Sequence, residues 1–428
     1  MAAIGVRDPR GGVVRRTTSV RLRLDDPVAA PALAARIRAL QPVAADVSAE
    51  VAAILDGVRS GGDAALAGYV ERFDRSSGPL RVAPEELATA LDALEGEVRA
   101  GLEIAIENVG AVARAGVGAD VEVDLPQGQR VLLREVPVRR AAIYVPGGRA
   151  PYPSTVVMGA VTAQAAGVDE VVVCAPGAHP VILAACALCG VGEVYRMGGA
   201  HAVAALAYGT ASVARVDVIA GPGNLWVQEA KRLVSGEVGI DGFAGPSDVL
   251  VLAAAGADAA LVAIDLLAQA EHGEGTLAVA VSDDGALLDD VAERIGEAGD
   301  SGAAIALVDV PDVITGLALS EAFAPEHLEL TGAGAEALAP QIRSAGCVFV
   351  GASGATAFGD YVAGSNHTLP TGGAARFASG LGARHFRRRM SEVHIGPAAG
   401  ALARAGAPIA RAEGFGLHAA SMEVRDNG

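Results

Sequence analysis

Short runs rich in Val, Ile and Ala alternate with Ala-rich helical patterns over most of the chain that follows Arg140. Strands separated by helices of about 10–15 residues indicate βαβ units, and such units build parallel sheets. The alternation comes in two successive sets, so we predict an α/β protein with two doubly wound, incomplete Rossmann-like parallel-sheet domains. The expected strands cover residues 141–145, 170–174, 193–197, 216–220, 248–253, 276–282, 303–308 and 347–350.

The regions outside these two sets have a different pattern. Residues 47–69 and 84–112 are long, charged and amphipathic, which predicts helices. The end of the chain contains no convincing strand, so we expect small helical extensions at both termini. The expected division is an N-terminal extension over 1–21, a first α/β domain over 22–139 with 241–378, a second α/β domain over 140–240 and a tail over 379–428.

The composition limits the kinds of partner. Hydrophobic residues make up 51% and aromatic residues 4% of the 428 residues, which suits helices packed closely on parallel sheets. The net charge of −17 argues against nucleic acid and anionic lipid, because phosphates attract the opposite sign. No uninterrupted apolar run reaches the roughly 18–20 residues of a membrane helix, so we expect a cytoplasmic protein. Lys231 is the only lysine and the other basic residues are arginine, which we interpret as a result of genome composition rather than function.

Two cysteines, Cys186 and Cys189, have the spacing of a redox or zinc pair. They lie in an apolar run over 181–189, and no second cysteine pair completes a zinc site. We therefore expect buried helix thiols and no disulfide framework.

Three glycine-rich turns each follow an expected strand and precede a helix: Tyr144–Gly148, Met197–Ala200 and Gly221–Asn224. Glycine at the end of a strand lets a ligand approach the backbone, and a helix N-terminus favours anions. None of the turns matches G-x-G-x-x-G, and any one of them alone would be an ordinary connection between a strand and a helix. Three in one α/β unit indicate a crevice suited to a nucleotide.

Polar residues that can bind a metal occur in three distant segments. Gln269 and His272 are three apart near the end of an expected helix, so their side chains share one face. A histidine at a helix end is more often a cap than a ligand. Together with Asp360 and His418, however, the pair resembles the nitrogen and oxygen shell of a catalytic zinc.

Glu326 and His327 enter an expected strand side by side. Neighbouring strand residues point to opposite faces, so both reach one substrate only if the backbone turns there. In that case they form a pair of general bases; otherwise they are a solvated carboxylate and a capping histidine. His367 is either a second proton carrier or a structural hydrogen-bond donor. The remaining histidines, His179, His385 and His394, are expected at the surface.

Taken together, these segments resemble the histidinol dehydrogenase family, the zinc- and NAD-dependent enzymes of the last two steps of histidine synthesis. The resemblance extends from about Val47 to the tail. The motifs that carry it are Tyr144-Val-Pro-Gly-Gly148, Pro153-Ser-Thr-Val-Val-Met158, Gly221-Pro-Gly-Asn224, Gly239-Ile-Asp241, Ala244-Gly-Pro-Ser247, Gln269-Ala-Glu-His272, Ala324-Pro-Glu-His-Leu328, Gly359-Asp-Tyr361, Asn366-His-Thr-Leu-Pro-Thr371 and the pair Glu413 and His418.

The resemblance implies a role for each of these segments. The second α/β domain would bind NAD, and the first would carry most of the metal and substrate site. A homodimer is implied, in which the tail completes the neighbour's site. One Zn²⁺ per subunit would be bound by Gln269, His272, Asp360 and His418. The substrate would contact these four residues and Ser247, His327, His367 and Glu413. The dinucleotide would contact Tyr144, His201 and Asn224, and the bases would be Glu326 and His327.

The implied reaction converts L-histidinol to L-histidine through L-histidinaldehyde and uses two NAD⁺ in turn. His327 would take the hydroxyl proton, Glu326 would activate the water that forms the aldehyde hydrate, and zinc would mainly orient the substrate. The chain departs from the family's usual pattern at three positions. His201 stands where Gln is usual, Asp248 where Glu is usual and Gly273 where Asp is common.

Two other functions remain open. Relatives of this family oxidise other alcohols, such as a sulfonated propanediol, but Glu413 suits a substrate ammonium, whereas a sulfonate would call for extra arginine. A non-catalytic metal- or nucleotide-binding protein is the other alternative. The presence of Glu326, His327 and all four implied ligands argues against it.

Overall fold

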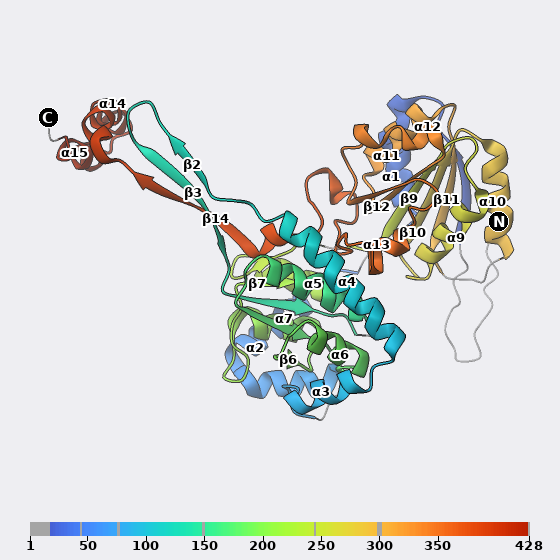
Figure 1. The fold of residues 1–428 in the computed structure, drawn as a ribbon, viewed down its shortest axis with the longest axis horizontal. Coiled ribbons are helices and arrows are strands. Elements are labelled where there is room, and N and C mark those ends of the chain that lie inside the picture. The colour runs from blue at the N-terminus through green and yellow to red at the C-terminus, as the bar shows by residue number, and fades with distance from the viewer. Residues whose placement is uncertain are drawn as a thin grey trace.

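The structure is a computed structural model that describes residues 18–42, 45–74, 78–147, 150–243, 245–297 and 302–426. Two α/β lobes lie side by side, and a long arm projects from one of them (Figure 1). The prediction of two parallel-sheet α/β units is confirmed. Most of the expected N-terminal extension lies outside the described residues, but Thr18–Arg23 forms a strand, β1, of the first sheet rather than part of an extension.

The first lobe contains a six-stranded parallel sheet. Helices α1 (Ala30–Arg38) and α11 (Val313–Phe323) cover one face, and α9 (Ala259–Ala270) and α10 (Gly285–Glu297) cover the other. Alternate residues of the three central strands enter the two cores, as the period of two requires. The strand order is β1, β11 (Ala304–Asp309), β10 (Leu277–Ser282), β9 (Asp248–Ala253), β12 (His327–Thr331) and β13 (Cys347–Val350).

The second lobe contains a five-stranded parallel sheet. Its order is β6 (Val194–Tyr195), β5 (Glu170–Cys174), β4 (Arg140–Tyr144), β7 (Val218–Ala220) and β8 (Gly239–Ile240). One face is covered by α3 (Pro84–Asp92), α4 (Gly96–Ala115), α5 (Pro153–Ala165) and α6 (Pro180–Leu188). The other face is covered by α2 (Ser48–Tyr69), α7 (Gly199–Tyr208) and α8 (Leu225–Val234).

The packing of α2, α3 and α4 differs from the expected division of the chain. Residues 22–139 were expected to belong with 241–378, yet these three helices pack on the five-stranded sheet. The pattern over 84–112 is also two helices, because the chain leaves the helix after Asp92 and re-enters it at Gly96. An amphipathic pattern shows that a helix has a buried face, but it does not show which sheet buries that face.

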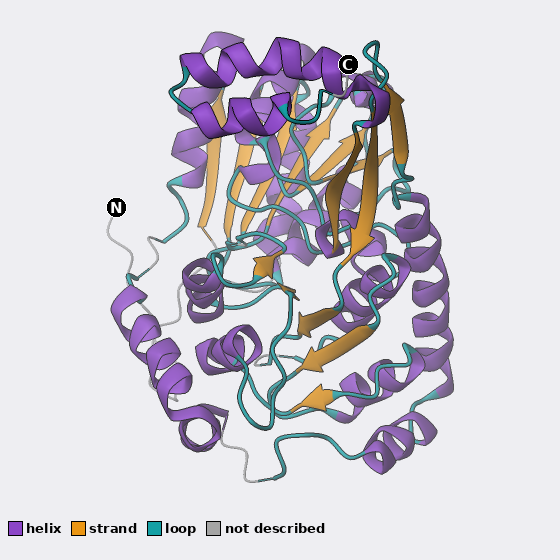
Figure 2. Ribbon diagram, turned by 90° about the vertical axis from the view of Figure 1, so that its left-hand side faces the viewer, coloured by secondary structure: helices purple, strands orange, loops and turns teal. Residues whose placement is uncertain are grey.

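The arm is a three-stranded antiparallel sheet that ends in two helices. Strand β14 (Arg387–His394) pairs with β3 (Arg130–Pro137), which pairs with β2 (Val121–Asp124). Helices α14 (Ala399–Ala412) and α15 (Gly416–Glu423) pack on each other at its tip (Figure 2). The tip lies away from both lobes (Figure 1). The expectation of a purely helical tail was wrong, because β14 reads Arg-Arg-Arg-Met-Ser-Glu-Val-His and shows no alternation of buried and exposed residues.

Short helical segments connect these elements. They are η1 (Pro27–Ala29), η2 (Val70–Asp74), α12 (Ala333–Glu336), η3 (Ala339–Gln341), α13 (Thr356–Tyr361), η4 (Ala374–Arg376), η5 (Ala383–Phe386) and η6 (Gly396–Ala398). Within the described ranges, no helix combines the length and the apolar composition that crossing a membrane requires.

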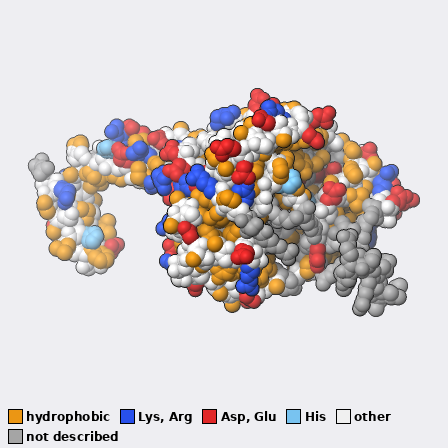
Figure 3. Space-filling view, turned by 90° about the horizontal axis from the view of Figure 1, so that it is seen from below, with side chains coloured by type: hydrophobic (Ala, Val, Ile, Leu, Met, Phe, Trp, Pro, Cys, Tyr) orange, Lys and Arg blue, Asp and Glu red, His pale blue; other side chains and the backbone are white. Residues whose placement is uncertain are grey.

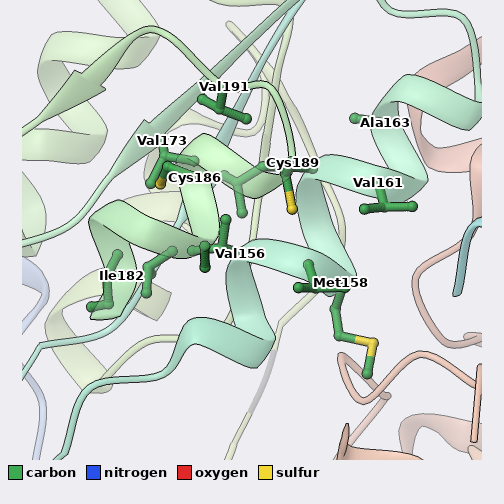
Figure 4. Close-up of a cluster of buried hydrophobic side chains, with 14 of the residues drawn as sticks. Val156, Met158, Val161, Ala163, Val173, Ile182, Cys186, Cys189 and Val191 are labelled. Atoms are coloured by element: carbon green, nitrogen blue, oxygen red, sulfur yellow. The ribbon is translucent and has the colours of Figure 1, made fainter. Parts of the chain in front are cut away.

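Cys186 and Cys189 lie among the buried side chains of the second lobe, near Val156 and Met158 (Figure 4). Both are free thiols. Burial raises the pKa of the Cys189 thiol to about 12, so it stays protonated and unreactive at neutral pH. The prediction of buried helix thiols is confirmed.

Candidate functional site

Two neighbouring cavities share the turns that follow β4 and β7. The larger, about 770 Å³, opens at the carboxyl edge of the five-stranded sheet, where ligands of doubly wound sheets usually bind. The smaller, about 290 Å³, is lined by residues of both lobes. Its residues from the six-stranded sheet come from the amino edge instead, because Ser247 precedes β9 and His327 opens β12.

Residues of all three glycine turns line the larger cavity: Gly147, Gly199 and Asn224. Tyr144 also lines it, and its Oη accepts a hydrogen bond from the Gly199 amide at 3.0 Å. Asn224 caps α8 through its side chain, which accepts from the Val227 amide. Gly148 of the first turn lies outside the described residues.

The turn at Gly221 is fixed by a buried ion pair. Gly221 has φ 123°, and a Cβ there would lie 2.1 Å from the Tyr144 carbonyl oxygen, so only glycine fits. Lys231 Nζ donates to the Gly221 carbonyl at 3.0 Å and to Asp241, and Asp241 accepts from the Gly221 amide at 2.8 Å. The scarcity of lysine was attributed to composition, but Lys231 itself is buried and holds a wall of the site.

Glu326 and His327 both line the smaller cavity. The backbone turns just before them, because Ala324 ends α11 in the left-handed conformation with φ 50°. Glu326 Oε2 accepts from Ser247 Oγ at 2.6 Å and from the Asp248 amide at 3.1 Å, and it lies 3.7 Å from His327 Nδ1. The pair is therefore turned toward one chamber, which is the arrangement that two bases acting on one substrate require.

The surroundings change the acidity of both groups. Burial raises the pKa of Glu326 to about 7, although His327 acts in the opposite direction. Burial alone would lower the pKa of His327, but the carboxylates of Glu326 and Asp360 outweigh it and raise the pKa to about 9. A carboxyl that titrates near neutral pH can both accept and release a proton under ordinary conditions.

Asp248, which was considered only as a departure from the family, orders this pair. Its buried side chain forms an ion pair with Arg38 at 2.8 Å and accepts from the Glu326 amide at 2.8 Å. Its backbone carbonyl lies 3.3 Å from His327 Nδ1. No pattern in the sequence predicts the Arg38 contact, because 210 residues separate the partners.

Three of the four expected metal ligands meet beside these bases. Gln269, His272 and Asp360 line one common pocket at the wall of the smaller cavity. Gln269 Nε2 donates to Ser247 Oγ at 2.7 Å, so the amide oxygen is the atom left for a metal. His272 Nδ1 lies 3.1 Å from the Gln269 carbonyl, which assigns the proton to Nδ1 and the lone pair to Nε2. Burial alone would raise the pKa of Asp360, but His327, His367 and His272 lower it, so the side chain is a carboxylate. These donors fit a zinc ion.

The structure does not bring the tail residues to this site. Glu413 and His418 are exposed on the arm, where His418 lies beside Phe415 with 5.2 Å between ring centroids. The arm tip stands well apart from the lobes (Figure 3). Across the described ranges of this single chain, no group of three or more His, Cys, Asp or Glu residues is placed to hold a metal.

The other histidines have structural contacts. His367 lines the smaller cavity, with Nδ1 3.0 Å from the Asp360 carbonyl and Nε2 3.3 Å from Thr155 Oγ1. Burial lowers its pKa, so it is neutral and links α13 to α5, which favours the structural alternative. His179 and His394 are exposed, as expected, whereas His385 is half-buried.

Comparison with known proteins agrees with this geometry. Residues 38–426 match the family model described as histidinol dehydrogenase. The chain belongs to the histidinol dehydrogenase family. It is 42% identical to the histidinol dehydrogenase of Rhizobium meliloti, covering 92% of this chain and 95% of that protein, and 41% identical to that of Rhodopseudomonas palustris, covering 95% and 99%. The crystal structure of histidinol dehydrogenase from Elizabethkingia anophelis superposes with a TM-score of 0.87 at 28% identity, covering 96% of this chain and 98% of that one. The resemblance seen in the sequence is confirmed.

Proposed function

We propose that this chain oxidises L-histidinol to L-histidine through L-histidinaldehyde, with two NAD⁺ and one Zn²⁺ per subunit. The observation that carries the proposal is that the two bases share a chamber of about 290 Å³ with His272 and Asp360, and that these two donors also line an adjoining pocket with Gln269. A cavity of about 770 Å³, large enough for a dinucleotide, adjoins it. Relatives that are named histidinol dehydrogenase and cover nearly the whole chain support the same assignment.

The cofactors would be held by separate walls of the site. Gln269, His272 and Asp360 would bind the zinc ion, and Tyr144 and Asn224 would lie against the dinucleotide. When bound, NAD⁺ accepts hydride and Zn²⁺ supplies a fixed template for the substrate's imidazole and amine.

The residues of the chain would move the protons. His327, in its neutral form, would take the proton of the substrate hydroxyl; because its pKa is raised to about 9, this step should be faster at alkaline pH. Glu326 would take a proton from the water that adds to the aldehyde. Ser247 donates to Glu326 while accepting from Gln269, so the base and a metal ligand are ordered by one hydroxyl. The partly buried chamber would keep the aldehyde from escaping to solvent.

A homodimer with exchanged tails would complete the site. Glu413 and His418 are exposed on an arm that points away from its own lobes (Figure 1). We propose that the arm of a second copy brings these two residues to the Gln269, His272 and Asp360 donors.

Oxidation of a sulfonated diol is less well supported. Among the described residues, the lining of the smaller cavity includes neither Arg nor Lys, and a sulfonate without a cationic partner would be buried at high cost.

The test is the number of NADH formed per L-histidinol consumed, measured before and after chelation. We expect two NADH per substrate, loss of activity on chelation, and recovery with Zn²⁺. A folded, zinc-loaded protein that forms no NADH from L-histidinol would contradict the proposal, and sulfonated diols would then be tested.

A further inference from the structure

A buried carboxylate lies in the wall of the larger cavity. Asp74 ends η2, and its Oδ2 accepts from His201 Nε2 at 2.9 Å and from the Gly198 amide at 3.0 Å. The side chain of Asp74 is 8% exposed and that of His201 2% exposed. Both hydrogen bonds end on Oδ2, so Oδ1 is the oxygen that can accept from a ligand in the cavity.

The side chain of His201 is held by ring stacking as well as by its hydrogen bond to Asp74. It stacks on Tyr69 and Phe73, with ring centroids 6.1 Å and 5.8 Å apart. Its side chain therefore has little freedom to turn into the cavity. Asp74, rather than His201, is the polar group of this pair that a ligand can contact.

The pair occupies the end of the larger cavity remote from the bases. The turns around Gly147 and Asn224 adjoin the smaller cavity, which Pro146 and Gly223 line. Ile54, Phe73 and Asp74 line only the larger cavity. A dinucleotide whose nicotinamide reaches the bases would place its adenosine half at Asp74.

We propose that Asp74, positioned by His201, is the cofactor-selecting residue that accepts an adenosine ribose hydroxyl and excludes a 2′-phosphate. The inference rests on the proposed use of a nicotinamide dinucleotide. Asp74 also accepts from an amide at the start of α7, so a carboxylate already lies where that helix end would otherwise attract a phosphate. A ribose diol pairs with a carboxylate, whereas a phosphate beside it meets a like charge in a poorly solvated wall.

The chain provides its own binding reporter. Trp226 is the only tryptophan and lines the same cavity, so its fluorescence can follow dinucleotide binding without turnover. We expect the wild-type protein to bind NAD⁺ at least about 100-fold more tightly than NADP⁺. Asp74→Asn should weaken NAD⁺ binding about 10-fold and reduce the preference to below about 10-fold. Glu71→Gln, which removes an exposed carboxylate from the same segment η2, is the matched control and should change neither constant.

The positioning role of His201 is tested by comparing a variant that lacks a hydrogen-bond donor with one that keeps it. His201→Leu removes the donor to Asp74 and should lower the NAD⁺ preference, whereas His201→Gln keeps a donor and should retain it within about 3-fold. A role in packing alone would affect stability in both variants but not the ratio of the two dissociation constants. If Asp74→Asn does not fold by circular dichroism, Asp74→Ser removes the same charge.

The outcomes separate this inference from the proposed function. Equal binding of NAD⁺ and NADP⁺ by the wild type, or an unchanged preference in the folded Asp74 variant, would overturn the role of Asp74 alone. Binding of neither dinucleotide, together with no NADH from L-histidinol, would contradict the proposed cofactor itself.

Discussion

Glu326 is expected to separate the two oxidations. Its carboxylate form, to which we assign the activation of water, becomes dominant as the pH rises through its pKa of about 7. We therefore expect L-histidinaldehyde oxidation to accelerate as the pH rises through about 7. Glu326→Gln should lower kcat for this step about 10²–10⁴-fold and remove the inflection. NADH formation from the aldehyde, followed by stopped flow across this pH range, measures both effects.

The first oxidation serves as an internal control for the same variant. His327, rather than Glu326, is expected to take the hydroxyl proton, so Glu326→Gln should still form close to one NADH per L-histidinol. If the rates of both oxidations fell equally in Glu326→Gln, the assignment of separate roles to Glu326 and His327 would be wrong.

At the residue scale, the sequence identified groups by their chemistry but missed those that position them. Glu326, His327, Gln269, His272 and Asp360 were all predicted, since polar residues in apolar surroundings are conspicuous. The supporting contacts are not local: Arg38 reaches Asp248 across 210 residues of sequence, and His201 reaches Asp74 across 127. No periodicity encodes such pairs.

The Lys231–Asp241 pair should contribute strongly to stability and to the larger cavity. Their side chains are 1% and 5% exposed, so removing one partner leaves an uncompensated buried charge. Lys231→Met should destabilise the protein by about 3–5 kcal/mol and weaken dinucleotide binding through the Gly221 turn. Urea unfolding followed by circular dichroism measures the first effect.

The double variant Lys231→Met/Asp241→Asn separates charge from packing. It removes both charges, so it should unfold at a higher urea concentration than Lys231→Met alone. A double variant that is less stable than the single one would show that the buried charge is not the cause.

At the element scale, most strands of the two parallel sheets were predicted, whereas β1, β8 and the arm were not. Strands such as Asp248–Ala253 and Cys347–Val350 are bounded by helices and rich in β-branched or apolar residues. The arm strands are exposed on both faces, as in Val121–Asp124, so their sequence carries no burial pattern. Their pairing depends on β3 and β14, which lie some 250 residues apart.

Two carboxyl groups, Asp265 and Glu329, connect the elements that carry two of the proposed metal donors. Asp265 on α9 forms a hydrogen bond with Glu329 on β12, and Glu329 also accepts from the Thr356 amide and hydroxyl at the start of α13. Helix α9 carries Gln269, and α13 carries Asp360. Burial, then the charge of Glu329, raises the pKa of Asp265 to about 7. In its protonated form Asp265 can donate to Glu329 and so connect α9 to β12.

Protonation of Asp265 in the folded state predicts that the stability of the protein depends on pH. The pKa of Asp265 is raised in the folded state, so its contribution is complete below the unfolded-state pKa of about 4 and is lost as the pH rises through about 7. Because Asp265 is only partly buried, we expect a loss of about 1 kcal/mol.

Asp265→Asn keeps a hydrogen-bond donor that does not titrate, so it should flatten this part of the plot of stability against pH. Thermal unfolding of the metal-free protein between about pH 5 and 8 measures it, and the exposed Glu293→Gln on α10 is the control. An unchanged slope in Asp265→Asn would assign the loss to another group.

At the scale of the whole molecule, one chain contains all the proposed site residues, but those of the tail lie far from those of the lobes. The three proposed metal donors and the two proposed bases lie at the lobes, while Glu413 and His418 are exposed at the tip of the arm. If a second copy supplies the tail, Glu326 and His418 of one site come from different chains. Mixing two inactive variants then distinguishes exchange of tails from a tail that folds back on its own lobes.

We expect Glu326→Gln and His418→Ala to form little L-histidine on their own. Mixed 1:1, dissociated and reassembled, half of the dimers should combine the two chains, and each mixed dimer contains one intact site. About one quarter of the wild-type rate of L-histidine formation should therefore return, because a two-fold assembly pairs each lobe with the partner's arm. Each variant reassembled with itself is the control and should show no gain. If every tail served its own chain, both sites of a mixed dimer would carry one defect, and no activity would return at any mixing ratio.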